Sequence, residues 1–307
     1  MAKEPRSLHG KVVAITGGAR GIGKATAKAL AREGATIAIG DLDRELAEKT
    51  ASELGPEAIG LGLDVTERES FANFLDQVTE RLGSLDVLIN NAGIMPIGPF
   101  LEEDDATARR QIDINLHGLI YGMKLALPGM LERGSGHVIN LASQAGKAGF
   151  PGGATYSGTK HAVVGLSEAV RAELRDTGVE ISVVMPAVVN TELGSGLPEN
   201  RAVKKLEPEE VADEIVRALQ FPKFDVWVPR NTVALYKVLQ LLPRGTREAF
   251  ARFIKADKVL AEPDRAARAK YEDRAARSEP GLEPEKVAAE DKKEPAAEED
   301  KKESPVA

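Results

Sequence analysis

The chain has 307 residues, of which 42% are hydrophobic, so it is long enough to form one large domain with a buried core. A net charge of -7 argues against a nucleic-acid partner, and the absence of cysteine excludes disulfides, thiolate catalysis and cysteine-bound metals. We expect no metal site. No apolar stretch is long enough to span a bilayer and no secretory signal precedes the first apolar run, so we expect a cytoplasmic protein.

Short apolar runs alternate with helical patterns along the first 230 residues. The runs predict strands at 11–16, 36–40, 58–63, 85–89, 137–141, 181–185 and 225–228. The segments between them predict helices at 24–33, 44–54, 67–82, 107–131, 156–177 and 208–220. Because the strands are apolar on both faces, helices must cover both sides of a parallel sheet. The prediction is an α/β fold, a Rossmann-like doubly wound parallel sheet of about seven strands.

The first strand runs into a glycine-rich turn that opens a helix, from Gly17 to Gly23. Glycines let the backbone approach a pyrophosphate, and the helix N-terminus offers N–H groups and the positive end of its dipole. Asp41 ends the second strand, where a carboxylate accepts hydrogen bonds from an adenosine ribose and repels a 2′-phosphate. Arg20, in the loop, would instead favour that phosphate. We weight Asp41 more heavily and expect NAD rather than NADP.

The fifth strand leads into a segment that carries a serine, a tyrosine and a lysine. Tyr156 and Lys160 are four residues apart, so on a helix they share one face. A cation beside a phenol lowers its pKa from about 10, which suits proton transfer near neutral pH. Ser143 is placed to bind the same substrate oxygen. A tyrosine and a lysine at this spacing are often only a surface pair; the cofactor loop upstream favours the catalytic interpretation.

Together these motifs resemble the short-chain dehydrogenase/reductase family over most of the first 230 residues. Thr16–Gly23 matches its cofactor loop and Asn90–Gly93 its sheet-stabilising motif. The catalytic residues match in identity and spacing, and they are Ser143, Tyr156 and Lys160, with Asn115 at the position of the active-site asparagine. One departure is Pro186–Ala187, where the family has Pro-Gly; an alanine fits there if its φ is negative.

The resemblance implies hydride transfer between a nicotinamide and a carbinol or carbonyl carbon. Tyr156 would be the general acid or base, Lys160 would lower its pKa, and Ser143 would hold the substrate oxygen. Asn115 would anchor a water that links Lys160 to solvent. The cofactor residues implied are Gly17, Arg20, Gly21, Ile22, Gly23, Asp41, Asp64, Val65, Asn91, Ala92, Gly93, Tyr156, Lys160, Pro186, Val189 and Thr191.

Two other functions use the same fold, a dehydratase or epimerase and a non-catalytic nucleotide sensor. The complete set of Ser143, Tyr156 and Lys160 favours a dehydrogenase over both. The resemblance also implies a homodimer or homotetramer, built through the long helices at 107–131 and 156–177, whose apolar residues lie on more than one side.

Apolar residues dominate the expected substrate pocket, and no fixed cation is placed to bind a carboxylate or phosphate. These residues are Ile94, Met95, Pro96, Phe150, Pro151, Met185, Val188 and Leu193. We therefore expect a lipophilic secondary alcohol or ketone, such as a steroid, a terpenoid or a long-chain alcohol. The loop at 191–206 is the expected lid.

The chain divides into three parts: a catalytic domain at 1–230, an amphipathic helical extension at 231–262 and a charged tail at 263–307. The extension is basic and predicts helices at 233–242 and 247–260. We expect it to pack on the core or in a subunit interface; a cover on the pocket, or membrane-surface contact through 233–260, is the less favoured alternative. The tail has few large apolar residues and is expected to be disordered.

Overall fold

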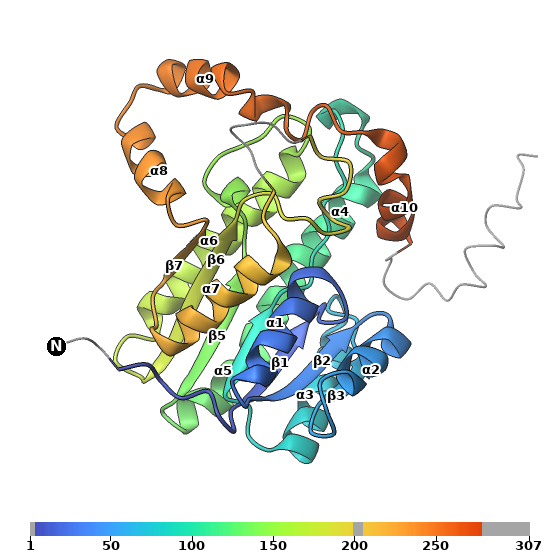
Figure 1. Ribbon diagram of the computed structural model, residues 1–307, viewed down its shortest axis with the longest axis vertical. Coiled ribbons are helices and arrows are strands. Elements are labelled where there is room, and N and C mark those ends of the chain that lie inside the picture. Colours follow the sequence, from blue (N-terminus) through green and yellow to red (C-terminus); the bar gives the residue numbers. More distant parts are fainter. Residues whose placement is uncertain (1–3, 199–204, 278–307) are drawn as a thin grey trace, which may run out of the picture.

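The computed structural model describes residues 4–198 and 205–277. Within them, seven parallel strands form one sheet in the order β3-β2-β1-β4-β5-β6-β7 (Figure 1). The strands are β1 (Val12–Thr16), β2 (Thr36–Asp41), β3 (Ile59–Gly62), β4 (Val87–Asn90), β5 (Gly136–Leu141), β6 (Val179–Pro186) and β7 (Asp225–Val228). The strand order reverses between β1 and β4, which makes the sheet doubly wound and confirms the predicted fold.

Helices cover both faces of the sheet, as the apolar strands require. They are α1 (Gly21–Arg32), α2 (Arg44–Ser52), α3 (Arg68–Leu82), α4 (Asp105–Ile112), α5 (Gly118–Glu132), α6 (Ala154–Glu173) and α7 (Pro208–Gln220). Helices α1, α2 and α7 share one apolar core cluster with one face of the sheet. Helices α3, α5 and α6 share a second cluster with the other face.

The side chains of strand β1 pack alternately into the two apolar clusters, one on each face of the sheet. Val13 and Ile15 are fully buried in the cluster with α1 and α7, whereas Val12 and Ala14 are buried in the cluster with α3 and α5. Successive side chains of a strand point to opposite faces, so a strand covered on both sides must be apolar at every position. The central strands thereby place their carboxyl ends, and the polar residues that follow them, at one edge of a rigid core.

The helix expected at 107–131 is interrupted. The segment Asp113–His117 forms a π-helical turn between α4 and α5. A π-helical turn inserts one extra residue into the ladder without breaking the apolar pattern, and such turns are frequent at functional sites. Asn115 lies at the centre of this turn.

The C-terminal extension is helical, as expected, and its helices are α8 (Thr232–Gln240), α9 (Arg244–Phe253) and α10 (Arg265–Ala276). The structure corrects the predicted start of the disordered tail at residue 263, because α10 follows directly. Asp264 caps this helix by accepting hydrogen bonds from the backbone N–H groups of Ala266 and Ala267. The rest of the expected tail lies outside the described residues.

Packing of α8 and α9 on the core, the arrangement expected from the sequence, is limited to the first half of α8, through Val233 and Tyr236. Tyr236 lies against Trp227 of β7, with 4.8 Å between the ring centroids. Neither helix contains a buried residue, and Leu241 and Phe253 are 86% and 84% exposed. Figure 1 shows the two helices as an arch that projects from the body. No helix in the described ranges is long and apolar enough to cross a membrane.

Candidate active site and cofactor site

The glycine loop after β1 is bonded to the segment after β4, its neighbour in the sheet. The hydroxyl of Thr16 accepts hydrogen bonds from the backbone N–H groups of Asn91 and Ala92, each at 3.0 Å. The side-chain amide of Asn91 donates in return to the carbonyl oxygens of Thr16 and Gly17, each at 2.9 Å. The motif Asn90–Gly93 therefore fixes the shape of the cofactor loop, and Gly93 lies beside the catalytic residues described below.

Two glycines of this loop are required by close backbone contacts. Gly17 has φ +60, and a Cβ atom there would lie 2.9 Å from the Cα atom of Ala92. A Cβ atom on Gly23 would lie 2.4 Å from the carbonyl oxygen of Gly17. Helix α1 begins at Gly21, and the side chain of Arg20 does not cap it. This helix N-terminus has no side-chain cap and is preceded by a glycine-rich loop, an arrangement that fits a pyrophosphate.

Asp41 ends β2 beside the glycine loop. Its carboxylate accepts hydrogen bonds from the backbone N–H groups of Ala19 at 3.1 Å and Asp43 at 3.2 Å. Burial raises the pKa of Asp41, and these two hydrogen bonds oppose that rise. The guanidinium of Arg20 forms an ion pair with Asp43 at 2.5 Å. The only cation predicted in the cofactor loop is thus already bound to a carboxylate of the protein.

The other predicted cofactor residues lie around the same edge of the sheet. Asp64 follows β3 and accepts hydrogen bonds from the backbone N–H and the hydroxyl of Thr66. Val65 is buried against α5, because a Cβ atom on Gly118 would lie 2.9 Å from its side chain. Ile22 is in the first turn of α1 and packs against the core.

The loop after β6 completes the cofactor side. Pro186 ends β6, and Val189 pairs with Leu206 through an isolated bridge. The methyl group of Thr191 would be 3.1 Å from a Cβ atom on Gly21, so the loop reaches the start of α1. Within residues 4–198 and 205–277, Asp176 and Lys255 are the non-glycine residues with positive φ. Ala187 is not among them, which explains why alanine is tolerated where the family has glycine.

Tyr156 and Lys160 lie on the first turns of α6, at the carboxyl end of β5, and both side chains are buried. The ammonium of Lys160 donates to the carbonyl oxygen of Leu141 at 2.9 Å and lies 5.7 Å from the centre of the Tyr156 ring. Burial lowers the pKa of Lys160 to about 8. The two residues meet as their spacing predicts.

The sequence predicts that Lys160 lowers the pKa of Tyr156, but in the structure this pKa is raised. Burial raises this pKa to about 12, and the hydrogen-bonding side chain of Ser143 and the charge of Arg268 oppose the rise. The ammonium of Lys160 lies over the ring and donates to a backbone carbonyl, so burial dominates. Ser143 also accepts a hydrogen bond from the backbone N–H of Ala145 at 3.1 Å. Near neutral pH the Tyr156 hydroxyl is therefore protonated in the free protein.

Asn115 connects the segment after β4 to α6. Its side-chain oxygen accepts from the backbone N–H of Ile94 at 2.8 Å, and its amide donates to the carbonyl oxygen of Ile94 at 2.9 Å. The same amide also donates to the hydroxyl of Thr159 at 3.2 Å. A Cβ atom on Gly93 would lie 3.1 Å from the Asn115 oxygen and 3.7 Å from the Lys160 ammonium. Both side chains thus border the same glycine, and the role of Asn115 in holding a water stays a prediction.

An apolar cluster surrounds Tyr156. Its buried members are Met95, Ala145, Tyr156, Leu197, Val259 and Leu260, and Ile97, Phe150, Val188 and Leu193 pack against them half-buried. Four of the residues predicted to line the pocket gather here. Met185 does not, because it is fully buried in the sheet core, and that prediction is wrong. Ile94 also belongs to the sheet core, Pro96 is half-buried and Pro151 is exposed.

The sequence analysis missed the contribution of the C-terminal segment to this site. Val259 and Leu260 pack in the cluster with Tyr156, and Arg268 and Tyr271 of α10 are buried beside Met95. Two signals in the sequence point to this helix. Asp264, after a proline, is a good N-cap, and Tyr271 is an aromatic residue in a segment otherwise rich in charge.

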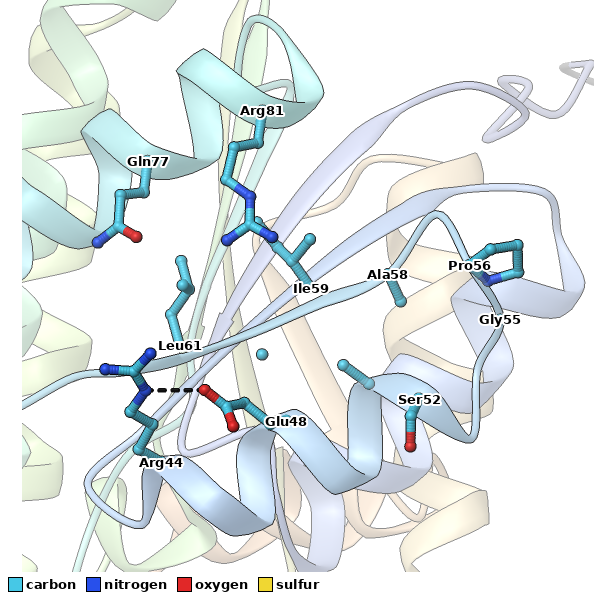
Figure 2. Close-up of a pocket in the computed structure, with 12 residues that line it drawn as sticks. Arg44, Glu48, Ser52, Gly55, Pro56, Ala58, Ile59, Leu61, Gln77 and Arg81 are labelled. Carbon is cyan, nitrogen blue, oxygen red and sulfur yellow. Dashed lines mark hydrogen bonds and ion pairs between the residues drawn. The ribbon is translucent and has the colours of Figure 1, made fainter.

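A separate hollow of about 630 Å³ lies at the edge strand β3, between α2 and α3 (Figure 2). Arg44 and Glu48 on its floor bond to each other at 2.8 Å, and Arg81 and Gln77 reach over it from α3 (Figure 2). None of the predicted catalytic or cofactor residues lines this hollow. It is open and lies away from the carboxyl ends of the central strands, so we place the active site at those ends.

Comparisons with known proteins agree with this geometry. Residues 11–202 match the family model for short chain dehydrogenases. The chain is 38% identical over 191 residues to sorbitol dehydrogenase from Cereibacter sphaeroides, a match that covers 62% of this chain and 75% of that protein. It is 37% identical over 227 residues to 2-(S)-hydroxypropyl-CoM dehydrogenase 3 from Xanthobacter autotrophicus, covering 68% of this chain and 89% of that protein.

A solved structure gives the same result at the level of the fold. The crystal structure of a short chain dehydrogenase/reductase from Burkholderia phymatum in complex with NAD superposes with a TM-score of 0.70. The two sequences are 26% identical, and the match covers 76% of this chain and 94% of that one. From its motifs, its fold and these matches, the chain belongs to the short-chain dehydrogenase/reductase family, whose members are oxidoreductases that act on CH–OH groups with NAD(H) or NADP(H).

Proposed function

We propose that this protein is an NAD(H)-dependent dehydrogenase of lipophilic secondary alcohols, or a reductase of the matching ketones, such as steroids, terpenoids or long-chain alcohols. The observation that carries the substrate class is the apolar cluster around Tyr156, which includes Met95, Leu197 and Leu260. Charged groups near the Tyr156 hydroxyl are engaged by the protein: Lys160 donates to a backbone carbonyl, and Arg268 to three. A polar or anionic substrate would find few partners there.

The preference for NAD rests on two carboxylates. The Asp41 carboxylate, at the end of β2, would accept hydrogen bonds from the ribose hydroxyls and repel a 2′-phosphate. Arg20, which would otherwise attract that phosphate, is paired with Asp43. Asp64 and Val65 would border the adenine, Lys160 and Tyr156 the nicotinamide ribose, and Thr191 the carboxamide.

When bound, the nicotinamide accepts or supplies the hydride, and this chain's own residues handle the proton. In oxidation, the substrate hydroxyl gives its proton to the Tyr156 oxygen as its carbinol carbon gives up a hydride, which leaves a ketone. In reduction, the Tyr156 hydroxyl gives its proton to the carbonyl oxygen. The hydroxyl of Ser143 holds that oxygen in place. The ammonium of Lys160 stabilises the phenolate that forms, because a cation beside a phenolate favours the charged state.

A coupled assay with a panel of alcohols tests this function. Purified protein, NAD and either hydroxysteroids, terpenols, aliphatic secondary alcohols or sorbitol are combined, and NADH formation is followed by absorbance. We expect turnover with at least one lipophilic class and a much lower kcat/KM for sorbitol. Turnover confined to sorbitol and similar polyols would refute the substrate class, and exclusive use of NADP would refute the cofactor preference.

A further inference from the structure

Arg268 on α10 is a buried cation that has no role in the proposed hydride and proton transfer. It is 1% exposed and is the largest of the fully buried side chains in the described ranges. Burial of a charge is unfavourable unless the group is paired and fully hydrogen-bonded, so a buried guanidinium needs a specific set of partners. Arg268 has such a set, and it extends well beyond its own helix.

The guanidinium of Arg268 bonds to three backbone carbonyls on two different segments. Nη1 donates to the carbonyl oxygens of Leu193 at 2.8 Å and Ser195 at 2.9 Å, and Nη2 donates to that of Met95. Nε donates to Glu272 at 2.6 Å, which supplies the balancing charge from the next turn of α10. Because the guanidinium already donates to these protein groups, it is not placed to bind a substrate anion. Its hydrogen bonds instead join separate segments of the chain.

Both of the joined segments contribute residues to the apolar cluster around Tyr156. Met95 follows the motif at 90–93 and packs in the apolar cluster with Tyr156. Leu193 and Ser195 belong to the loop after β6, which also carries Thr191 and Leu197. Leu197 packs in the same cluster. Arg268 therefore ties the substrate-side loop to the segment next to the catalytic residues.

Tyr271, one helical turn after Arg268, reinforces the same connection. Its hydroxyl accepts a hydrogen bond from the backbone N–H of Met95 at 2.7 Å, and its ring centre is 4.7 Å from the Arg268 guanidinium. Both backbone polar groups of Met95 are therefore bound by α10, the N–H by Tyr271 and the carbonyl by Arg268. Met95 has its position set by a helix about 170 residues further along the chain.

The start of α10 is bonded to the same loop through the backbone. The N–H of Asp264 donates to the carbonyl oxygen of Gly196 at 2.7 Å. Gly196 has φ +67, and a Cβ atom there would lie 2.5 Å from the carbonyl oxygen of Asp264. The loop therefore needs glycine at this position both for its conformation and for the approach of α10.

We propose that Arg268 is a positioning residue that holds the loop 191–197 and Met95 in one arrangement around Tyr156, so that α10 closes the substrate side of the active site. The inference deepens the proposed function and rests on it for its kinetic test. It makes α10, together with Val259 and Leu260, one of the parts of the chain that decide which substrates fit. The charge of Arg268 also opposes the burial-driven rise in the pKa of Tyr156, which agrees with its place beside the site.

The first test compares Arg268→Ala with Arg277→Ala, a matched control at the C-terminal end of the same helix. Arg277 has a 70% exposed side chain, and its side-chain partner among the described residues is Asp273 in the last turn of α10. We expect Arg268→Ala to raise the KM for the alcohol by about tenfold or more, because several charge-assisted hydrogen bonds are lost. The dissociation constant of NADH should change by less than about threefold, since Thr191 is the only predicted cofactor residue that lies in the loop 191–197. The control should match wild type.

Added guanidinium ion separates positioning from general loss of structure. In Arg268→Ala, millimolar guanidinium chloride should enter the vacated site and restore part of the kcat/KM, with no effect on wild type or the control. Arg268→Lys should keep a partial function, because one ammonium cannot make the planar set of bonds. If Arg268→Ala does not fold, Tyr271→Phe takes its place: it removes the bond to Met95 and keeps the ring, and we expect a KM about threefold higher.

Hydrogen exchange in the NADH complex gives a readout that needs no substrate. Loss of the hydrogen bonds from Arg268 or Tyr271 should raise the exchange rate of backbone amides in the loop 191–197. We expect this in Arg268→Ala and Tyr271→Phe, but not in Arg277→Ala. If the wild-type protein turns over no alcohol, the proposed function fails. The exchange measurement still tests whether Arg268 and Tyr271 hold the loop 191–197 in place. Unchanged exchange in that loop, or wild-type KM in the folded variants, would overturn the proposal.

Discussion

At the scale of single residues, burial moves the pKa values of the two neighbouring catalytic groups in opposite directions. Burial raises the pKa of Tyr156 to about 12 and lowers that of Lys160 to about 8. A neutral tyrosine and a lysine that releases its proton readily are the states that an apolar environment favours. The free protein therefore holds Tyr156 as a proton donor, which suits reduction of a ketone near neutral pH.

This charge state predicts opposite pH profiles for the two directions. In alcohol oxidation Tyr156 must be deprotonated, and because its pKa is raised, the active base becomes scarcer as the pH falls. We expect kcat/KM for oxidation to increase between about pH 6 and pH 8 and kcat/KM for reduction to stay level or fall over that range. Steady-state rates in both directions, measured in buffers of constant ionic strength, check this. An oxidation rate that falls towards pH 8 would contradict it.

The cofactor preference is a second residue-scale prediction. Asp41→Ala removes the carboxylate expected to repel a 2′-phosphate, so the ratio of kcat/KM for NAD over NADP should fall by about tenfold. Asp43→Ala should act in the same direction by another route, since it frees Arg20 from its ion pair. Kinetics with both cofactors test each variant. If wild type already prefers NADP, the carboxylates do not decide the choice.

At the scale of elements, the sequence predicts the sheet and the motif-bearing loops well, because their signals are local. Each strand is an apolar run, and the glycine loop, Asp41, the motif at 90–93 and Ser143 all lie at or just after the end of a strand. The π-helical turn at 113–117 gives no such signal, since one inserted residue leaves the apolar pattern of the helix intact. Helix α10 was missed for a different reason: its buried residues are Arg268, Tyr271 and Ala275, so its inner face lacks the repeated large apolar side chains that mark a core helix.

The C-terminal helix changes what truncation should do. From the sequence alone, removing everything after Pro263 is expected to be harmless. Because α10 binds Met95 and the loop after β6, a chain that ends at residue 263 should lose most of its activity and expose the apolar cluster around Tyr156. A chain that ends at residue 277 retains these contacts and serves as the control. Equal activity of the two truncated proteins would contradict the role of α10.

At the scale of the whole molecule, the arch of α8 and α9 presents apolar side chains that the described residues of this chain leave uncovered. Leu235, Val238 and Leu241 are 46%, 58% and 86% exposed along α8 and its end. Isolated exposed apolar residues are ordinary, but a stripe of this kind usually contacts another surface. Of the arrangements expected from the sequence, a subunit interface agrees with this exposure better than packing on the core of the same chain.

Self-association is therefore expected at micromolar concentration. Light scattering after size-exclusion chromatography should give the mass of a dimer or tetramer, by resemblance through α4, α5 and α6. The double variant Leu241→Glu, Phe253→Glu shows whether the arch takes part: a smaller mass assigns it to an interface, and an unchanged mass leaves the oligomer to the other helices. A monomeric mass for the unmodified chain would contradict the prediction.

The central claim is that Tyr156 handles the proton while a hydride moves between substrate and cofactor. The most direct measurement uses a secondary alcohol, taken from the active class in the panel, that carries deuterium at its carbinol carbon. Mass spectrometry of the reduced cofactor should show one deuterium, and Tyr156→Phe should form labelled cofactor about a hundredfold more slowly with unchanged NADH binding. Reduced cofactor without label, or near-normal turnover by Tyr156→Phe, would contradict the account.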